Sequence, residues 1–261
     1  FMIFRSSQKR LVTPKLCIED VELEQVQTFN FLGLTIDESL NWKAHTDKIS
    51  SKIARAMGIL NNLKNFLPVN IKLTLYNSLI LPHINYNIIL WGKHNKRIFK
   101  LQKKVMRILT CSSYNAHTDP LFKSLNLLKI QEIYMLSKYK LYYKRINNSL
   151  PEFLMKFPFH TASDVHNHNT RRKTALFVPR VNHEFAKFSI KYLIPKCIND
   201  APQIILNKLY THSFHGFTFF VKRYFLNTYQ IECTKTIVIF VNVKSLTIHQ
   251  NIGKSICILL H

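Results

Sequence analysis

The spacing of apolar residues changes near residue 40, from the alternation typical of strands to the repeat of three and four typical of helices. In the segment KLCIEDVELEQV, apolar and polar residues alternate, which predicts a half-buried hairpin. The short apolar segments 1–4 (FMIF) and 29–36 (FNFLGLTI) predict one strand each. Gly33, inside the second, predicts either a bulge or a place where another backbone comes close. Residues 1–41 are therefore expected to form a small β segment.

Residues 42–150 predict a helical domain. Three residues that favour helix starts precede it: Asp37, Ser39 and Asn41. Apolar residues then recur at helical spacing: Ile49, Ile53, Met57, Leu60, Leu63 and Leu67. Further helices are expected over about 70–81, 96–109 and 130–147. Asp119 and Pro120 predict the cap and the first residue of another helix.

The rest of the chain gives weaker patterns. Residues 151–174 are polar and His-rich, which is typical of a linker or loop. Residues 175–230 predict strand-like pieces and one helix over SFHGFTFFVKRYFL, and the tail 231–261 is β-prone and of uncertain origin. The expected fold is therefore α+β and mostly α, with a β rim, a basic helical bundle and a loosely packed C-terminal region.

Charge indicates the partners. The net charge is +23, from 37 Lys and Arg against 14 Asp and Glu, and residues 42–150 hold nineteen of the cations but three acids. Nucleic acid is the leading partner that such a charge predicts, and an anionic membrane surface is the second. No 18-residue apolar run predicts a membrane span, and the chain does not start like a signal peptide.

Residues 96–109 (KRIFKLQKKVMRIL) carry the clearest candidate for nucleic-acid binding. At about 100° per residue, the apolar residues fall on one arc of a helix. The cations fall on the opposite arc, with no acid among them: Lys96, Arg97, Lys100, Lys103, Lys104 and Arg107. Stable surfaces usually mix signs, because like charges one turn apart repel. This arc predicts a face that meets phosphates, and a merely solvated face is the alternative.

Three other groups of residues have a structural and a functional interpretation. Tyrosines interleave with cations in 130–147, so they either stack on bases or belong to the core; helical spacing favours the core. The five cysteines include no CxxC pair and are interpreted as reduced intracellular thiols. His166 and His168 have no accompanying Cys, Asp or Glu cluster, so they do not predict a metal site.

Motifs for catalysis are not found. The sequence contains no Gly-rich phosphate loop, no GxSxG and no HExxH. Two-metal phosphoryl transfer needs paired carboxylates. The adjacent acids, Glu19-Asp20 and Asp37-Glu38, lie where turns are expected. No catalytic residues and no metal site are therefore expected in this chain.

Several separate segments, in order, resemble one family. They are FNFLGLTIDESLNWKAHTDKISSKIARAMGILNNLKNFLP, LYNSLILPHINYNIILWG, LQKKVMRILT, YNAHTDPLFKSLNLLKI, SIKYLIPKCINDAP and FFVKRYFL. Together they resemble the region after the active site in reverse transcriptases of non-LTR (LINE-type, jockey-like) retrotransposons, over roughly residues 1–228. The segment CINDAP departs from the WNSLP-like segment that is usual in the family.

The resemblance implies roles for particular residues. Phe31, Leu32 and Gly33 match the family's primer grip at the junction of palm and thumb, which holds the 3′ end of the primer. The basic helices that follow would be the thumb, with an RNA template and an RNA–DNA or DNA primer duplex as partners. A glycine lets a backbone approach a phosphodiester closely.

The resemblance also implies what this chain does not carry. The family's catalytic Tyr/Phe-x-Asp-Asp pair lies upstream of Phe1, so the chain is expected to be a fragment without polymerase activity of its own. Mg²⁺ is expected in the full-length parent and no cofactor in this chain. The expected location is intracellular, with nuclear access for target-primed insertion. The alternatives are a stand-alone nucleic-acid-binding remnant and a decayed sequence that does not fold.

Overall fold

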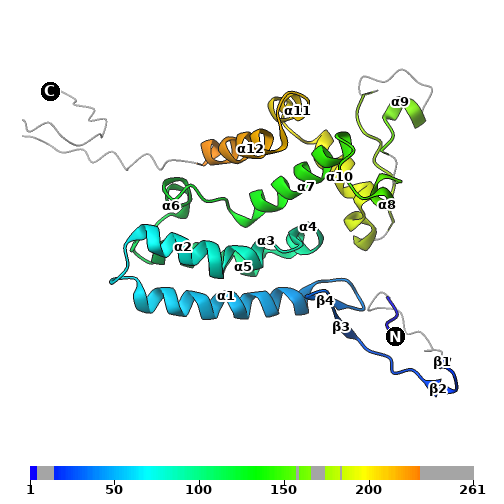
Figure 1. The fold of residues 1–261 in the computed structure, drawn as a ribbon, viewed down its shortest axis with the longest axis horizontal. Helices are drawn as coiled ribbons and strands as arrows, with labels where there is room; N and C mark the ends of the chain where they lie inside the picture. The colour runs from blue at the N-terminus through cyan, green and yellow to red at the C-terminus, as the bar shows by residue number, and fades with distance from the viewer. Residues whose placement is uncertain (5–14, 157–158, 166–173, 183, 230–261) are drawn as a thin grey trace, which may run out of the picture.

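The computed structural model describes residues 1–4, 15–156, 159–165, 174–182 and 184–229 (Figure 1). These residues form mostly helices with two small antiparallel strand pairs, which confirms the expected α+β fold that is mostly α. The strands are β1 (Cys17–Ile18), β2 (Val21–Glu22), β3 (Thr28–Phe31) and β4 (Leu34–Asp37).

The first group of helices belongs to the predicted helical region. It comprises α1 (Lys43–Leu63), α2 (Val69–Leu79), α3 (Leu81–Asn85), α4 (Ile88–Trp91), the 3-10 turn η1 (Gly92–His94), α5 (Lys96–Leu109), α6 (Thr118–Ser124) and α7 (Ile130–Ile146). The later helices are α8 (Glu152–Met155), α9 (Ala162–Val165), η2 (Glu184–Phe188), α10 (Ile190–Asn199), α11 (Gln203–Leu209) and α12 (Phe214–Thr228).

The first predicted hairpin is present, but it is not half-buried as predicted, because the residues of both strands are exposed, Ile18 by 61% and Val21 by 65%. Cys17 pairs with Glu22 and Ile18 with Val21, in antiparallel register. The strand predicted for residues 1–4 is wrong, because these residues form no ladder. They are nevertheless tied to the following chain: the Phe1 amino group donates to the Glu24 carbonyl at 2.7 Å.

The segment 29–36 is not one strand, as predicted, but parts of two. Phe31 lies opposite Leu34 in the β3–β4 register, so Leu32 and Gly33 form the turn between them. Both have positive φ, 46° and 80°. Positive φ at two successive turn residues matches the twist of a tight hairpin, and glycine adopts it without steric cost. Gly33 is therefore a turn residue and the predicted bulge is wrong.

A single carboxylate organises the start of α1. Asp37 Oδ1 accepts the N–H groups of Ser39 and Asn41, both at 3.1 Å, and Oδ2 accepts the N–H of Trp42 at 3.0 Å. Burial by itself would raise the pKa of Asp37, but these hydrogen bonds, with that from the Ser39 hydroxyl, lower it overall. The predicted helix start is confirmed. Asp37 satisfies the backbone donors of the loop that leads into α1, and Asn41 Oδ1 accepts the N–H of Lys43, the first residue of the helix, at 2.8 Å.

The helices stack in layers (Figure 1). The long helix α1 lies along α5, α2 packs beside them, and α7 lies across α4 and η1. The other side of α7 carries α10 and α12. The apolar repeat of α1 is buried in this stack at Ile49, Ile53 and Leu60. None of the helices in the described residues has the length and apolar composition that a membrane crossing needs.

The tyrosines of α7 belong to the core, as their spacing favoured. Tyr134, Tyr139 and Tyr143 are all buried. Tyr139 stacks on Phe225 and Tyr143 on Phe217, both from α12. These rings fasten α12 to α7 instead of offering a surface for bases.

Two further expectations are corrected here. The strand-like pieces predicted for 175–230 are wrong for the described residues. These form mainly helices from Glu184 onward, and residues 174–182 are irregular apart from one isolated pairing of Leu176 with Thr161. The helix over SFHGFTFFVKRYFL is confirmed as α12. Asp119 does not cap α6, which begins one residue earlier; its carboxylate pairs with Lys129 Nζ at 2.8 Å. The tail 231–261 and the two histidines at 166 and 168 lie outside the described residues.

Candidate nucleic-acid interface

Helix α5 begins and ends where the sequence predicted and separates its two arcs. Ile98, Val105 and Leu109 are buried, and Gln102 is buried with them. The Gln102 amide donates to Tyr76 Oη and to the Leu128 carbonyl, both at 3.0 Å, and its oxygen accepts the N–H of Ile130 at 3.0 Å. Because this buried amide meets three partners, it fixes α5 against α2 and α7.

The six predicted cations lie on the uncovered side of α5, but they form two rows. Lys96, Lys100, Lys103 and Arg107 follow one another at helical spacing and make the outer row. Arg97 and Lys104 make an inner row toward α1. The six cations therefore remain together on one helix, on the side away from its packed face.

The inner row is partly neutralised across the helix pair. Arg97 forms an ion pair with Asp47 of α1, which the sequence could not reveal because the two residues are fifty positions apart. Lys103 of the outer row lies over the ring of Phe99, 4.8 Å from its centroid. A cation over a ring face is held in place but keeps its charge.

The candidate primer-grip residues lie at the tip of the β3–β4 hairpin. Phe31 and Leu32 are 53% and 73% exposed, so their apolar side chains are offered outward. The Tyr86 hydroxyl donates to the Leu32 carbonyl, and a Cβ on Gly33 would lie 3.5 Å from the Tyr86 ring. A side chain therefore approaches Gly33, where the sequence left a bulge and an approaching backbone open.

Hydrogen bonds link this hairpin to the start of α5. Lys48 of α1 donates to the Asn30 side chain in β3 at 3.1 Å, and the neighbouring Asp47 holds Arg97. His45 accepts the N–H of Thr35 at 3.2 Å. Burial, with the charges of Lys48 and Lys52, lowers the pKa of His45, which favours this neutral acceptor form. The hairpin and the first turn of α5 are thus held at the same end of α1.

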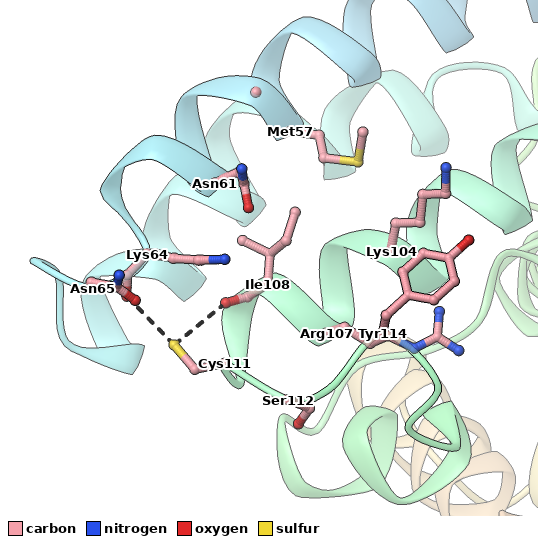
Figure 2. Close-up of a pocket in the computed structure, with 11 residues that line it drawn as sticks. Met57, Asn61, Lys64, Asn65, Lys104, Arg107, Ile108, Cys111, Ser112 and Tyr114 are labelled. Atoms are coloured by element: carbon pink, nitrogen blue, oxygen red, sulfur yellow. Dashed lines mark hydrogen bonds between the residues drawn. The ribbon is translucent and has the colours of Figure 1, made fainter.

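A cavity lies at the opposite end of α5. It measures about 640 Å³ and opens between α1, the end of α5 and the loop 110–117 (Figure 2). Lys104 and Arg107 line it together with Lys64 and Tyr114, which the sequence analysis did not single out. The walls come from segments some fifty residues apart, and no short-range pattern marks such a meeting.

Metal ligands are not grouped in the described part of the chain. No cluster of three or more His, Cys, Asp or Glu side chains with the geometry to hold a metal ion occurs there. Of the three described cysteines, Cys17 and Cys111 are exposed and Cys197 is buried, all as free thiols.

Two curated proteins of Drosophila melanogaster are similar to this chain. One is a probable RNA-directed DNA polymerase from the transposon X-element, 29% identical over 130 residues, and the other is a probable RNA-directed DNA polymerase from the transposon BS, 30% identical over 128 residues. The matches cover 47% and 46% of this chain and 14% of each relative, so the chain corresponds to a small part of their length. No protein-family model and no solved structure matches.

Proposed function

We propose that this chain, which is related to the RNA-directed DNA polymerases of transposons, is the part of a non-LTR reverse transcriptase that holds the template–primer duplex. The similarity supports the class of protein, and the charge of α5 supports the role. The observation that carries the proposal is the outer row. Lys96 and Lys100 are exposed, and Lys103 and Arg107 are half-buried. All four lie on the side of the helix opposite its packed face, and no acid of α5 interrupts them.

The geometry suits phosphates more than bases. From Lys96 to Arg107 the helix rises about 16 Å. A duplex of that length carries about ten phosphates, at one charge per 1.7 Å or so of its axis. Flexible cations along such a stretch neutralise backbone charge and carry no sequence information. This chain would then follow a duplex of any sequence, as copying requires.

The β3–β4 hairpin is the proposed contact for the primer end. Phe31 and Leu32 present exposed apolar side chains, and Gly33 lets the turn stay narrow. The contacts from Asn30 to Lys48 and from Asp47 to Arg97 connect both this hairpin and the first turn of α5 to the start of α1. The proposal assigns nucleotide incorporation to carboxylates outside this chain, and Mg²⁺-dependent primer extension by the chain alone would contradict it.

Salt dependence of binding tests the proposal. We expect the chain to bind an RNA–DNA duplex with an affinity that falls steeply as salt rises, by a logarithmic slope of about 0.9 per phosphate contact. Replacing Lys96, Lys100 and Lys103 by Gln should lower that slope by about two to three and weaken binding equally for unrelated sequences.

A charge-matched control removes three cations elsewhere. Lys196, Lys208 and Arg223 lie on α10, α11 and α12, so their replacement by Gln changes the net charge equally and leaves α5 intact. The control variant should retain most of the salt dependence of binding that the wild type shows. Equal losses in both triple variants would mean that net charge, and not the outer row, determines binding.

A further inference from the structure

The inner end of the cavity between α1 and α5 is fixed by a buried lysine. Lys72 is 2% exposed, and its Nζ donates to the Lys64 carbonyl at 3.1 Å and to Cys111 Sγ at 3.2 Å. The Cys111 thiol lies 3.5 Å from the same carbonyl (Figure 2). These contacts tie the end of α1 to the loop after α5, so the cavity is formed before any ligand arrives.

Three cations line this cavity. They are Lys64, Lys104 and Arg107, and the described residues around the cavity include no Asp or Glu. Arg107 is held in place, because its Nε donates to the Ala116 carbonyl at 2.9 Å. That bond uses one of the five donors of a guanidinium group, and the remaining fork suits a phosphate.

An exposed aromatic ring stands beside these cations. Tyr114 is 77% exposed, and Figure 2 shows its ring next to Lys104 and Arg107. The opposite wall comes from α1, with Met57 and the amide of Asn61. An open ring beside phosphate-binding cations is the arrangement that holds single-stranded nucleic acid. The amide can both donate to and accept from the edge of a base.

From these residues we infer that the cavity binds one nucleotide, with its base against the Tyr114 ring and its phosphate on Lys104, Arg107 and Lys64. The volume suits this, since small-molecule sites usually measure about 300–1,000 Å³. A site for a bare anion would need the cations but neither the ring nor the amide.

The nucleotide has two sources with the same chemistry. One is a single-stranded nucleotide beyond the duplex that the outer row holds, and this source rests on the proposed function. The other is a free nucleoside phosphate. A preference for an overhang over a blunt duplex identifies the first, and binding of a fluorescent nucleoside triphosphate identifies the second.

Gly58 offers a way to fill the cavity without disturbing the core. It lines the cavity, and a Cβ at this position would meet nothing within 4 Å apart from its chain neighbours and the backbone of its own helix. Gly58→Leu therefore adds a side chain at the cavity wall. Asn62→Leu is the matched control, because Asn62 is exposed on the same helix outside the cavity.

A second pair of variants does not depend on α1. Tyr114→Ala removes the exposed ring and should not affect folding. Tyr210→Ala removes another exposed tyrosine, 72% accessible and distant in sequence, and serves as its control.

The experiment compares an RNA–DNA duplex carrying a short single-stranded overhang with the same duplex made blunt, and adds the labelled triphosphate alone. We expect the overhang or the triphosphate to gain about five- to a hundredfold in affinity over the blunt duplex or over background, as one stacked base does. Gly58→Leu and Tyr114→Ala should each remove that gain, while both controls keep it and blunt-duplex binding stays unchanged.

The outcomes separate the two proposals. Loss of blunt-duplex binding in the outer-row variant, with no gain for either probe in the wild type, would leave the proposed function standing and overturn the nucleotide site. If the wild type binds the triphosphate, Gly58→Leu abolishes that binding, and no blunt duplex is bound, the nucleotide site stands and the proposed function is overturned. If both probes bind to Gly58→Leu and Tyr114→Ala as to the wild type, the inference is wrong.

Discussion

Helices α5 and α7 both mix cations with apolar residues, and the fold uses them in opposite ways. In α5, Lys96 and Lys100 are exposed on an uncovered side. In α7, Lys138 is 6% exposed and lies over the ring of Tyr134, 4.2 Å from its centroid. The difference is in the neighbours, because α7 has helices packed on both sides. Composition therefore does not decide whether the cations of a basic helix are exposed; the position of the helix among the layers does.

The largest expected effect is a loss of stability when a buried aromatic ring of α7 is removed. Tyr139 is 1% exposed and stacks on Phe225, so Tyr139→Ala leaves a cavity and should lower the free energy of unfolding by about 3–5 kcal/mol. Lys100→Ala, on the exposed side of α5, should change it by about 0.5 kcal/mol or less. Urea denaturation measures both, and equal losses would contradict the contrast between the two helices.

A second prediction compares a glycine that is packed against α7 with a glycine that has free space around it. A Cβ on Gly92 would lie 2.5 Å from the ring of Tyr134 in α7 and 2.9 Å from Ile88, so Gly92→Ala forces a shift of packed atoms. We expect a loss of about 1–3 kcal/mol in the free energy of unfolding. Gly58→Ala meets open space on α1 and should instead gain up to about 1 kcal/mol from helix propensity. Thermal unfolding of the two variants measures both effects. A Gly92→Ala protein as stable as the wild type would contradict the close packing of α7 against Gly92.

The smallest effect is a pH dependence confined to α7. Burial lowers the pKa of Lys138 below its usual 10.5, despite the opposing influence of Cys197. Between the lowered pKa and 10.5, the unfolded chain holds a proton that the folded chain has released, so stability rises with pH across this window. Relative to Lys138→Met, the wild type should therefore gain stability as the pH approaches 10.5. Parallel pH profiles of the urea midpoint for the two proteins would contradict a buried Lys138.

Sequence patterns were sufficient where a helix has one buried face. The bounds of α5 follow from its repeat, because four apolar residues must share one side. The β3–β4 turn was missed because its first residue is Leu32, whereas Asn or Asp before glycine is the usual signal. Asp119 resembles a cap in sequence but is drawn to Lys129, since tertiary charge overrides a local preference.

Only the part of the candidate site that lies on a single helix could be predicted from the sequence. The cations of α5 share one helix and can be placed by counting. The pairing of Arg97 with Asp47 and the meeting of Lys64, Lys104 and Tyr114 depend on how α1 and α5 pack. Contacts between residues about fifty positions apart leave no periodic signal in a single sequence.

The most direct test of the central claim locates the nucleic acid on the fold. A photo-crosslinking amino acid, placed in turn at Lys100 of α5 and at Lys144 of α7, removes one exposed lysine in each case. With a bound RNA–DNA duplex, the account predicts crosslinking from position 100, fading as salt rises from about 50 to about 200 mM, and little from position 144. Crosslinking from position 144 without any from position 100 would contradict it.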